Sequence, residues 1–423
     1  MRDRNVSVSG NATSHPPQLK VCMDKETADI SNLVSPTSLQ DALRSGAGYV
    51  SFKPSEISRQ AGAALFVNGR GREAWLQSEH IDVQRANELG AYFLVDAVIE
   101  GDCFVFYKGQ FLLDGSEPNR IALQYARDAG RLSAQKPALN KMEFTGPALV
   151  IAGPGHPIWG HWLLDFLPRL AIARSLLGDL LEQYIVPVPS DTPGWAFDMA
   201  YFFCGVQRKN FLLYDRSSEA VHCRNLVCMP TYAHSNYFFH PYLKEIYTSF
   251  VVHKRNSDLA RICVSRRFFT ESRSVARSFP QRDYFEDAAR RRGYTLIRPE
   301  SLDIRAQIDV FAEASIIVGE YGSGMHNALF SAANTIVGQF VMPNTIQSRI
   351  AGLCGHASVF LLPNSDPNFA DPRPATLDVS TKSIEEFFDV IDHLASSESR
   401  FFSNRQRSAT ELRFDPSGIF ARS

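Results

Sequence analysis

The sequence predicts an α/β protein with a parallel, doubly wound sheet in its second half and a β-rich N-terminal part. Between residues 261 and 341, short apolar strand signals alternate with amphipathic helical segments over short connections, which is typical of parallel sheets with helical crossovers. In the first half, strand signals include an alternating stretch around Lys108-Gly109 that indicates a hairpin. The length of 423 residues suits two or three domains.

The individual elements follow from apolar periodicity and turn residues. In the first half we expect a hairpin over 91–115, a strand within 148–155, a helix over 160–170, and strands near 182–190 and 225–230. In the second half we expect strands at 261–265, 294–297, 315–319 and 335–341, and helices at 282–293, 304–314, 325–333 and 383–395.

Two folded domains are expected between two tails. Residues 1–45 are rich in Ser, Asn and Pro and lack sustained periodicity, which predicts a mobile tail, and 401–423 is predicted as a second one. Between them we expect domains at 46–245 and 246–400, facing each other across a cleft. Open parallel sheets bind ligands beyond the carboxyl ends of their strands, so the chemically active side chains should lie in loops that follow strands.

Composition excludes several classes of protein. The formal net charge of -1 gives no bulk attraction to nucleic acid, and an apolar content of 44% indicates a globular core. No apolar run reaches the roughly 18–20 residues of a membrane span, and the first residues lack the apolar core of a signal peptide. The seven cysteines include no C-x-x-C pair, which argues against a disulfide framework or a structural zinc site. We expect a cytoplasmic protein, with a peripheral place at the inner membrane as the alternative.

The predicted helix over 160–170 carries a narrow polar stripe. His161, Asp165 and Arg169 are each four residues apart, a spacing that places them on one helix face. A histidine and a carboxylate in this relation can act as a general base and its orienting partner, in either order, and the arginine can bind an anion. The alternatives are a satisfied hydrogen bond in the core and half of a metal site, and no second pair of matching ligands is evident.

Two further candidate regions follow strands. Ser265, Arg266 and Arg267 come directly after the strand at 261–265, and adjacent guanidinium groups can grip a phosphate, although a solvated pair of arginines is the plainer alternative. The stretch GEYGSGMHN at 319–327 joins a strand to a helix, where backbone N–H groups can bind an anion. It lacks the pattern of a phosphate-binding lysine loop, a dinucleotide fingerprint and a nucleophile elbow. The candidate residues of this turn are Glu320, Tyr321, Gly322, Ser323, Gly324, His326 and Asn327.

Several of these turn residues have alternative roles. Glu320 could hydrogen-bond a ribose or sugar hydroxyl, or it could cap the next helix. His326 and Asn327 lie in the first turn of that helix and could contact a ligand or cap the backbone.

Together, G-H-W-L-L-D-x-L-P-R-L, S-R-R after a strand and G-x-x-G-x-G-x-x-N after a strand resemble the glycosyltransferase family 61 domain. That domain occurs in bacterial capsular-polysaccharide proteins, plant xylan transferases and eukaryotic O-GlcNAc transferases of secreted proteins. The resemblance covers about residues 148–345. The chain departs from the family at Tyr321, where His is common. It also departs at Met325 or His326, where the family has a small or apolar residue. It departs again after S-R-R, where Phe268-Phe269-Thr270-Glu271 replaces the usual Asp-Ala and basic run.

The resemblance implies a GT-B-like architecture of two Rossmann-like domains. It also implies an inverting, metal-independent hexosyl or pentosyl transfer from a nucleotide sugar, UDP-linked in common family use, to a glycan or polysaccharide acceptor. Residues 46–245 would then bind the acceptor and 246–400 the nucleotide sugar, with no separate cofactor. Arg266, Arg267 and the 322–327 turn would neutralise the leaving diphosphate. Asp165 is the favoured base and His161 its rival, because pairing with Arg169 would lower the pKa of Asp165, whereas an imidazole pKa near 6.5 suits the task.

Two other functions compete with this interpretation. A nucleotide- or dinucleotide-binding oxidoreductase would need a compact glycine fingerprint after an early strand and an acidic residue about 20 positions later, and the chain shows neither. A catalytically inactive protein that binds glycans or nucleotides could retain the arginines. His156, His222, His234, His240 and the tyrosines at 232–247 either line the acceptor side or serve only packing and surface roles.

Overall fold

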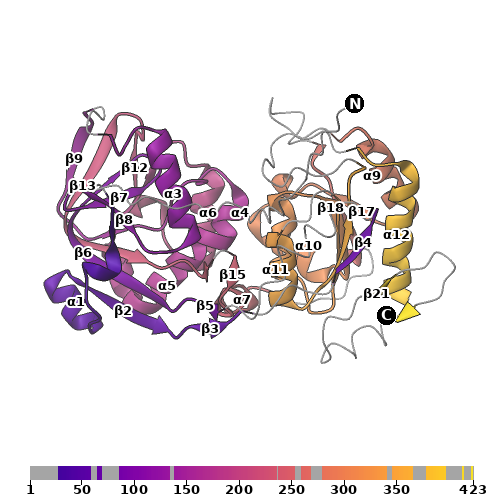
Figure 1. Cartoon of the computed structure of the whole chain (residues 1–423), viewed down its shortest axis with the longest axis horizontal. Coiled ribbons are helices and arrows are strands. Elements are labelled where there is room, and N and C mark those ends of the chain that lie inside the picture. The colour runs from indigo at the N-terminus through magenta and orange to yellow at the C-terminus, as the bar shows by residue number, and fades with distance from the viewer. Residues whose placement is uncertain are drawn as a thin grey trace, which may run out of the picture.

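The computed structural model describes residues 27–58, 64–68, 85–133, 138–235, 237–252, 259–267, 279–340, 345–364 and 378–396, and two short paired strands, β21 (Leu412–Arg413) and β22 (Ala421–Arg422). The fold is mixed α/β, as predicted, with two lobes lying side by side (Figure 1). Each lobe is built on its own sheet.

The first lobe holds a mixed sheet with the strand order β1-β8-β7-β6-β13-β10, in which β2 also pairs with β6 and β9 with β13. The predicted hairpin is confirmed, because β7 and β8 are joined by Lys108 and Gly109, whose φ angles are 52° and 77°, as this type of two-residue turn requires. The strands are β1 (Thr27–Asp29), β2 (Gly48–Lys53), β6 (Leu89–Glu100), β7 (Phe104–Tyr107), β8 (Gln110–Leu113), β9 (Asn140–Phe144), β10 (Ala148–Leu149) and β13 (Glu219–Pro230).

Helices and short strand pairs complete the first lobe. The helical segments are η1 (Ile30–Asn32), α1 (Leu39–Ser45), α3 (Glu117–Asp128), α4 (Trp159–His161), η2 (Trp162–Phe166), α5 (Leu167–Leu177), η3 (Gly178–Gln183), α6 (Gly194–Cys204), η4 (Arg208–Asn210) and α7 (Tyr242–Thr248). The strand pairs are β3 (Glu56–Ile57) with β5 (Arg85–Ala86), β11 (Val186–Pro189) with β12 (Phe211–Tyr214), and β14 (His234–Ser235) with β15 (Phe238–Phe239).

The second lobe holds the predicted parallel sheet, with the strand order β17-β16-β18-β19-β20-β4 and every pair parallel. Its strands are β16 (Arg261–Val264), β17 (Thr295–Ile297), β18 (Ile316–Glu320), β19 (Ile336–Phe340), β20 (Ala357–Leu361) and β4 (Ala64–Val67). Its helical segments are α9 (Arg282–Arg291), η6 (Pro299–Ser301), α10 (Ile304–Glu313), η7 (Ser323–Phe330), α11 (Thr345–Cys354) and α12 (Thr381–Ser396).

The two lobes share one continuous apolar cluster. Phe330 of η7 in the second lobe stacks on Phe203 of α6, with ring centroids 6.2 Å apart, and meets Tyr247 of α7 edge-on at 5.5 Å. Such aromatic pairs add to the free energy gained from apolar burial. A second cluster fills the space between the parallel sheet and α12. The contact of η7 with the first lobe therefore rests on packed side chains.

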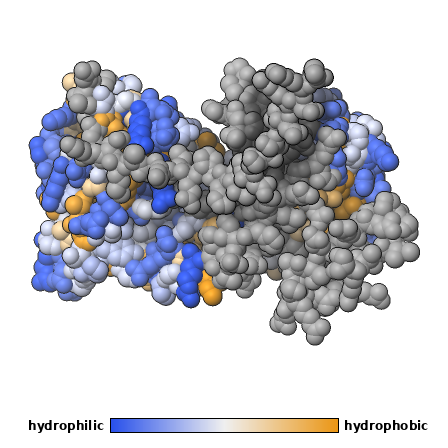
Figure 2. Space-filling view, in the orientation of Figure 1, coloured by the Kyte–Doolittle hydropathy of each residue, from blue (hydrophilic) through white to orange (hydrophobic). Residues whose placement is uncertain are grey.

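The surface of the first lobe is mainly hydrophilic on the face shown in Figure 2, where apolar residues lie in small groups between polar ones. The exposed large apolar side chains of the described residues come from separate elements, such as Leu33, Ile121 and Tyr201. Scattered apolar residues of this kind are normal on a globular protein. The apolar area that stabilises the fold is therefore concentrated in the interior.

Two segments of the chain differ from the prediction, one in being folded and one in the sheet that it joins. Part of the predicted N-terminal tail is folded, because residues 27–45 form β1, η1 and α1 and bury Ile30 and Ala42 completely. β4 comes from the stretch predicted for the first domain but forms the edge strand beside β20 in the second sheet. Residues 1–26 and most of 401–423 lie outside the described residues, and the domain boundaries stay a prediction.

Two helix predictions are corrected. The helix over 160–170 contains a π-helical turn at Trp162–Phe166, in which the N–H of Leu167 donates to the carbonyl of Trp162. Pro168 follows this turn, and a proline inside a helix has no N–H to donate and collides with the carbonyl four residues earlier, so a wider turn accommodates it. The helix predicted over 325–333 is instead the tighter 3-10 segment η7, preceded by Gly322 and interrupted by Gly324, residues that disfavour an α-helical start.

Candidate functional site

The polar centre of the first lobe is a carboxylate held between two imidazoles. The Nδ1 atom of His161 lies 2.5 Å from Oδ2 of Asp165, and Nε2 of His234 lies 2.7 Å from Oδ1 of the same carboxylate. His161 ends α4, Asp165 lies in the π-helical turn, and His234 opens β14 just after the long strand β13. Two segments far apart in the chain thus place all three side chains together.

The hydrogen bonds of His234 define its protonation. The backbone N–H of Tyr237 donates to Nδ1 of His234 at 3.1 Å, so Nδ1 is the unprotonated nitrogen. Nε2 therefore carries the proton and donates it to Asp165. The ring is fully buried and stacks on Tyr237 with centroids 4.8 Å apart. His234 is thus a neutral donor that holds the carboxylate in place.

Asp165 is an ionised acceptor. Burial alone would raise the pKa of its carboxyl, but the charge and hydrogen bond of His161, together with the hydrogen bond of His234, hold that pKa well below its usual range. The side chain is almost completely buried. With both oxygens engaged and a strong preference for the ionised form, Asp165 is suited to orient a neighbour rather than to accept a proton from a substrate.

His161 presents its second nitrogen away from Asp165. Burial acts to lower the pKa of His161, but the Asp165 charge and hydrogen bond outweigh it, so the pKa stands above its ordinary value. Nδ1 donates to Asp165, which leaves the lone pair of the neutral ring on Nε2. The side chain is 33% exposed. His161 is therefore the more accessible member of the pair, and its role as a base stays a prediction.

The loop before α4 is shaped around the His161 ring. Gly155 has a φ of +91°, and a Cβ atom there would lie 2.4 Å from Cδ2 and 2.8 Å from Nε2 of His161. No side chain fits in that space, and the backbone conformation itself favours glycine. The loop thus approaches the ring through the one residue type that leaves room for it.

Arg169 does not join Asp165, although it lies four residues further on. Its Nε–H donates to the carbonyl of Pro230 and an Nη1–H to the carbonyl of Ile151, each at 2.7 Å, and its guanidinium lies 4.5 Å from the ring centroid of Tyr232. The π-helical turn adds a residue per turn and so rotates the following residues by about 100° relative to an α-helix. Arg169 consequently ties the end of β13 to the segment after β10.

The second lobe meets this centre through η7. The imidazole of His326 packs against Gly160, where a Cβ atom would lie 2.5 Å from Nδ1 of His326 and 3.1 Å from Oγ of Ser323. Burial and the nearby charge of His161 lower the pKa of His326 to about 4, with Asp165 acting in the opposite direction. Neither ring nitrogen of His326 has a hydrogen-bond partner among the described residues.

Asn327 links the lobes by a buried chain of hydrogen bonds. Nε1 of Trp159 donates to Oδ1 of Asn327 at 2.8 Å, and Nδ2 of Asn327 donates to Oε1 of Gln307 at 2.8 Å. Asn327 is fully buried. Its amide is therefore engaged on both sides in this structure, and a ligand contact by this residue stays a prediction.

The arginines after β16 lie beside the turn after β18, as neighbouring parallel strands require. An Nη1–H of Arg266 donates to the carbonyl of Tyr321, and the guanidinium packs on Gly322, where a Cβ atom would lie 2.9 Å from it. Arg267 instead pairs with Asp283 and Glu286 of α9, and the hydroxyl of Ser265 donates to Glu286 at 2.7 Å. Residues 268–271, where the chain departs from the family pattern, lie outside the described residues.

The remaining turn residues have structural partners. Glu320 is buried in an ion pair with Arg282 at 2.5 Å. No side chain caps η7, and a ribose contact by Glu320 stays a prediction. The N–H of Tyr321 continues the sheet by donating to the carbonyl of Phe340 at 2.9 Å. A Cβ atom at Gly324 would lie in ordinary van der Waals range of Pro299 and Val264. The turn thus brings backbone, and the side chains of Ser323 and His326, to the boundary with α4.

His234 is the residue whose importance the sequence does not reveal. It is one of several histidines with no motif around it, and its pairing with Asp165 depends on the return of the chain along β13. The other three histidines weighed with it have separate contacts, His156 with Asp191, His222 with Asp96 and Glu143, and His240 with the carbonyl of Pro54.

Two further features are absent from the residues that the structure describes. In this part of the chain, no three His, Cys, Asp or Glu side chains are grouped so that they could hold a metal ion. No helix among the described residues is long and apolar enough to cross a membrane.

Comparison with known families confirms the resemblance seen in the motifs. The family model described as Glycosyltransferase 61 matches residues 159–338. The matched range starts at Trp159 and contains the His161–Asp165 pair, His234, the arginines after β16 and the turn after β18. None of the curated proteins compared with the chain matches it.

Proposed function

We propose that this chain, a glycosyltransferase by its family 61 domain, moves a sugar from a nucleotide-sugar donor to a hydroxyl group of a glycan or polysaccharide acceptor. We propose further that the transfer inverts the anomeric carbon, needs no metal ion and uses a GT-B-like pair of lobes. The first lobe would hold the acceptor and the second the donor.

The observation that carries the proposal is the alignment of His161 with Asp165 at the boundary between the lobes. An inverting transfer needs one base that takes the proton of the acceptor hydroxyl. The buried, ionised Asp165 fixes the ring of His161 by its Nδ1 and leaves Nε2 as the proton acceptor. This geometry supports His161 as the catalytic base and Asp165 as its positioning residue, the reverse of the preference drawn from the sequence.

The donor side is supported by Arg266 and the turn after β18. The leaving nucleoside diphosphate gains negative charge, and guanidinium and backbone N–H groups that point at it lower the barrier. Arg266 is held against Gly322 by its bond to the Tyr321 carbonyl, at the carboxyl edge of the parallel sheet, where open sheets bind ligands. Arg267 is the weaker candidate, because two carboxylates of α9 already pair with it.

The proposed step balances as one displacement. The acceptor oxygen forms a bond to the anomeric carbon while its proton passes to Nε2 of His161. The bond between the anomeric carbon and the diphosphate oxygen breaks, and the electron pair leaves with the diphosphate. Attack on the face opposite the leaving group inverts the configuration. The imidazolium that forms is stabilised by Asp165, whose other oxygen stays bound to His234.

A thermal-shift titration tests the proposal. The purified chain is titrated with UDP, GDP, CMP, ADP and NAD, with and without EDTA, because a ligand that binds the folded state raises the melting temperature. We expect a rise with one nucleoside diphosphate that EDTA does not abolish, followed by release of that diphosphate from the matching nucleotide sugar when acceptor is added. A rise with NAD alone would instead support an oxidoreductase.

A further inference from the structure

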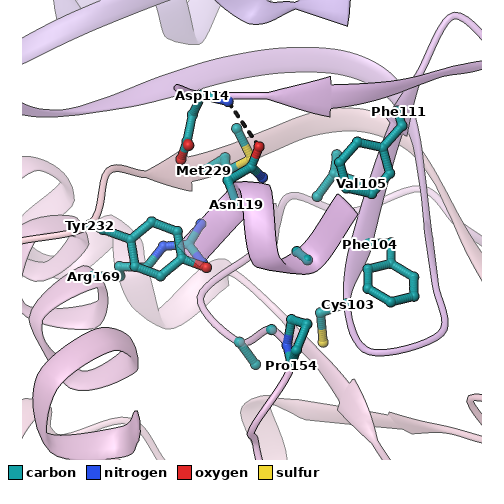
Figure 3. Close-up of a pocket in the computed structure, with 13 residues that line it drawn as sticks. Cys103, Phe104, Val105, Phe111, Asp114, Asn119, Pro154, Arg169, Met229 and Tyr232 are labelled. Atoms are coloured by element: carbon teal, nitrogen blue, oxygen red, sulfur yellow. Dashed lines mark hydrogen bonds between the residues drawn. The ribbon is translucent and has the colours of Figure 1, made fainter. Parts of the chain in front are cut away.

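A small cavity lies in the first lobe, and its lining includes Gly153 and Pro154 of the loop after β10. Figure 3 shows the residues that line it. Its free volume of about 20 Å³ exceeds the roughly 10–15 Å³ that one water molecule needs. Arg169 and Tyr232 form one polar wall, and Asp114 and Asn119 another. Asp114 and Asn119 are only partly buried, so the cavity is open on their side.

Arg169 brings an unpaired charge to this cavity. The side chain is only 2% exposed, yet no carboxylate among the described residues forms an ion pair with it. Its Nε–H and one Nη1–H donate to backbone carbonyls, and its three other N–H groups have no acceptor in the described part of the chain. The unpartnered nitrogen of this side chain is not among the fully buried unpartnered atoms of the described residues, so a group that enters the cavity can reach it.

Tyr232 presents a second unpartnered group to the same space. The residue is 7% exposed. Its hydroxyl has no hydrogen-bond partner among the described residues and is not one of their fully buried atoms, so a group that enters the cavity can reach it. Its ring lies against the Arg169 guanidinium, so both polar ends reach the cavity from one side.

Asp114 and Asn119 supply the complementary functions. Oδ1 of Asp114 accepts the N–H and O–H of Ser116, and no described residue donates to Oδ2. Oδ1 of Asn119 accepts the N–H of Asp114 at 3.1 Å, as Figure 3 shows, while no described residue accepts from Nδ2. The cavity therefore offers donors from Arg169 and Asn119, an acceptor from Asp114, and a hydroxyl from Tyr232 that can do either.

These groups select the chemistry of an occupant. An anion would face the Asp114 carboxylate, and a cation would face the Arg169 guanidinium. An apolar group would leave the unpartnered polar atoms of the four side chains without a partner. A hydroxyl group both accepts and donates hydrogen bonds, so it can bridge Arg169 and Asp114. Because it is neutral, it is repelled by neither charged side chain. We infer that this cavity is a subsite for a hydroxyl or hydroxymethyl group of a neutral sugar, whose ring stays outside.

The position of the cavity assigns that sugar to the acceptor. Its lining segments continue directly into the His161 centre, since Arg169 follows Asp165 by one helical turn, Tyr232 precedes His234 by two residues, and Gly153 precedes Gly155 by two. A sugar anchored here is thus held by the same backbone segments that position the base. The assignment to the acceptor rests on the proposed function, whereas the binding of a neutral sugar does not.

Direct binding of simple sugars tests the inference on the full chain. The probes are the methyl glycosides of xylose, glucose, galactose, mannose and N-acetylglucosamine, with methyl glucuronide as the anionic comparison, measured by saturation-transfer difference NMR. We expect at least one neutral glycoside to bind. Tyr232→Phe should weaken its binding about 5- to 10-fold, the scale of one neutral hydrogen bond, and Asp114→Asn about 10-fold or more, the scale of a hydrogen bond to a charged group. Tyr125→Phe is the matched control, because Tyr125 is 53% exposed on α3 and does not line the cavity.

Three results would overturn the inference. They are the absence of binding by every neutral glycoside, unchanged affinity in a folded Tyr232→Phe variant, and binding of the glucuronide alone. Unchanged affinity would leave the cavity a site for structural water only. Thermal melts verify that each variant folds. If Asp114→Asn does not fold, the affinity of the Tyr232→Phe variant decides whether the inference holds. Sugar binding without any transfer would refute the proposed function and keep the subsite. Transfer at an unchanged rate in both variants would keep the proposed function and refute the assignment of this sugar to the acceptor.

Discussion

His161 and Asp165 share a hydrogen bond of 2.5 Å between Nδ1 and Oδ2, and this bond shifts their pKa values in opposite directions. The pKa of the imidazole is raised and that of the carboxyl is lowered, because each charged form stabilises the other. The pair therefore links protonation of the base to the position of its ring, and several measurements can separate the two roles.

Asp165→Asn should lower turnover by about 100-fold or more while nucleoside diphosphate binding stays unchanged, the usual scale for a disabled general base. A base acts when unprotonated, so the raised pKa of His161 places the rise of rate with pH above pH 6.5 in the wild type. The variant loses the carboxylate charge but keeps the burial of His161, so the pKa of His161 should fall. The rise of its residual rate with pH should therefore occur at a lower pH than in the wild type. The measurement is kcat against pH, alongside calorimetry with the diphosphate.

His161→Asn provides the comparison. If His161 is the base, this variant should lose turnover at every pH between about 5 and 9. Its kcat should show no rise with pH, because no group with a pKa in that range replaces the imidazole. A fully active His161→Asn protein, combined with an inactive Asp165→Asn protein, would return the role of base to Asp165.

Gly155→Ala should lower turnover strongly, because its methyl group would overlap the His161 ring. Gly205→Ala is the matched control. Gly205 has a φ of +68°, but nothing lies within 4 Å of the position that its methyl group would take, so that variant bears backbone strain of about 1 kcal/mol without the clash. Both melting temperatures should fall, but only Gly155→Ala should reduce kcat. Equal kcat in the two variants would show that the loop does not position His161.

Arg266→Ala should weaken binding of the nucleoside diphosphate by about 1.5–3 kcal/mol, the scale of a charge-assisted hydrogen bond. Arg305→Ala is the control, since Arg305 forms an exposed pair with Asp309 on α10 and such pairs contribute little. Isothermal titration calorimetry measures both. Unchanged affinity in the Arg266 variant would remove this arginine from the donor site.

His326 should make the folded state sensitive to acid. Its folded-state pKa of about 4 lies below its ordinary value of 6.5, so the unfolded chain binds the proton first and the free energy of unfolding falls as pH drops from 6.5 toward 4. This one group accounts for a loss of about 3 kcal/mol over that window. Denaturant titrations at about pH 7 and pH 4 should show a smaller acid loss in His326→Gln than in the wild type. An identical acid loss would mean that His326 is already protonated in the fold.

Local patterns carried much of the fold and part of the site. The alternation of strands and helices from 261 onward predicts the parallel sheet, because a strand or helix buries its apolar face wherever its neighbours lie. Positive φ at Lys108 and Gly109 follows from a two-residue hairpin turn. The contact of His161 with Asp165 follows from helical spacing, since it spans one turn.

Other features depend on contacts between distant segments, which no local pattern encodes. Arg169 leaves the polar stripe because a π-helical turn before Pro168 rotates it toward the carbonyls of Ile151 and Pro230. β4 joins the second sheet through pairing with β20, which lies far along the chain. The folded part of the predicted tail is stabilised by the sheet on which it packs.

The sequence by itself determined the α/β class, the resemblance to glycosyltransferase family 61, and the candidates for a base and a phosphate-binding group, since these follow from short-range spacing. Only the tertiary structure decided how these candidates are arranged. It brought His234 onto Asp165, engaged both carboxylate oxygens and left Nε2 of His161 without a partner among the described residues. A pKa and a free lone pair depend on burial and on partners from distant strands, and those exist only once the chain has folded.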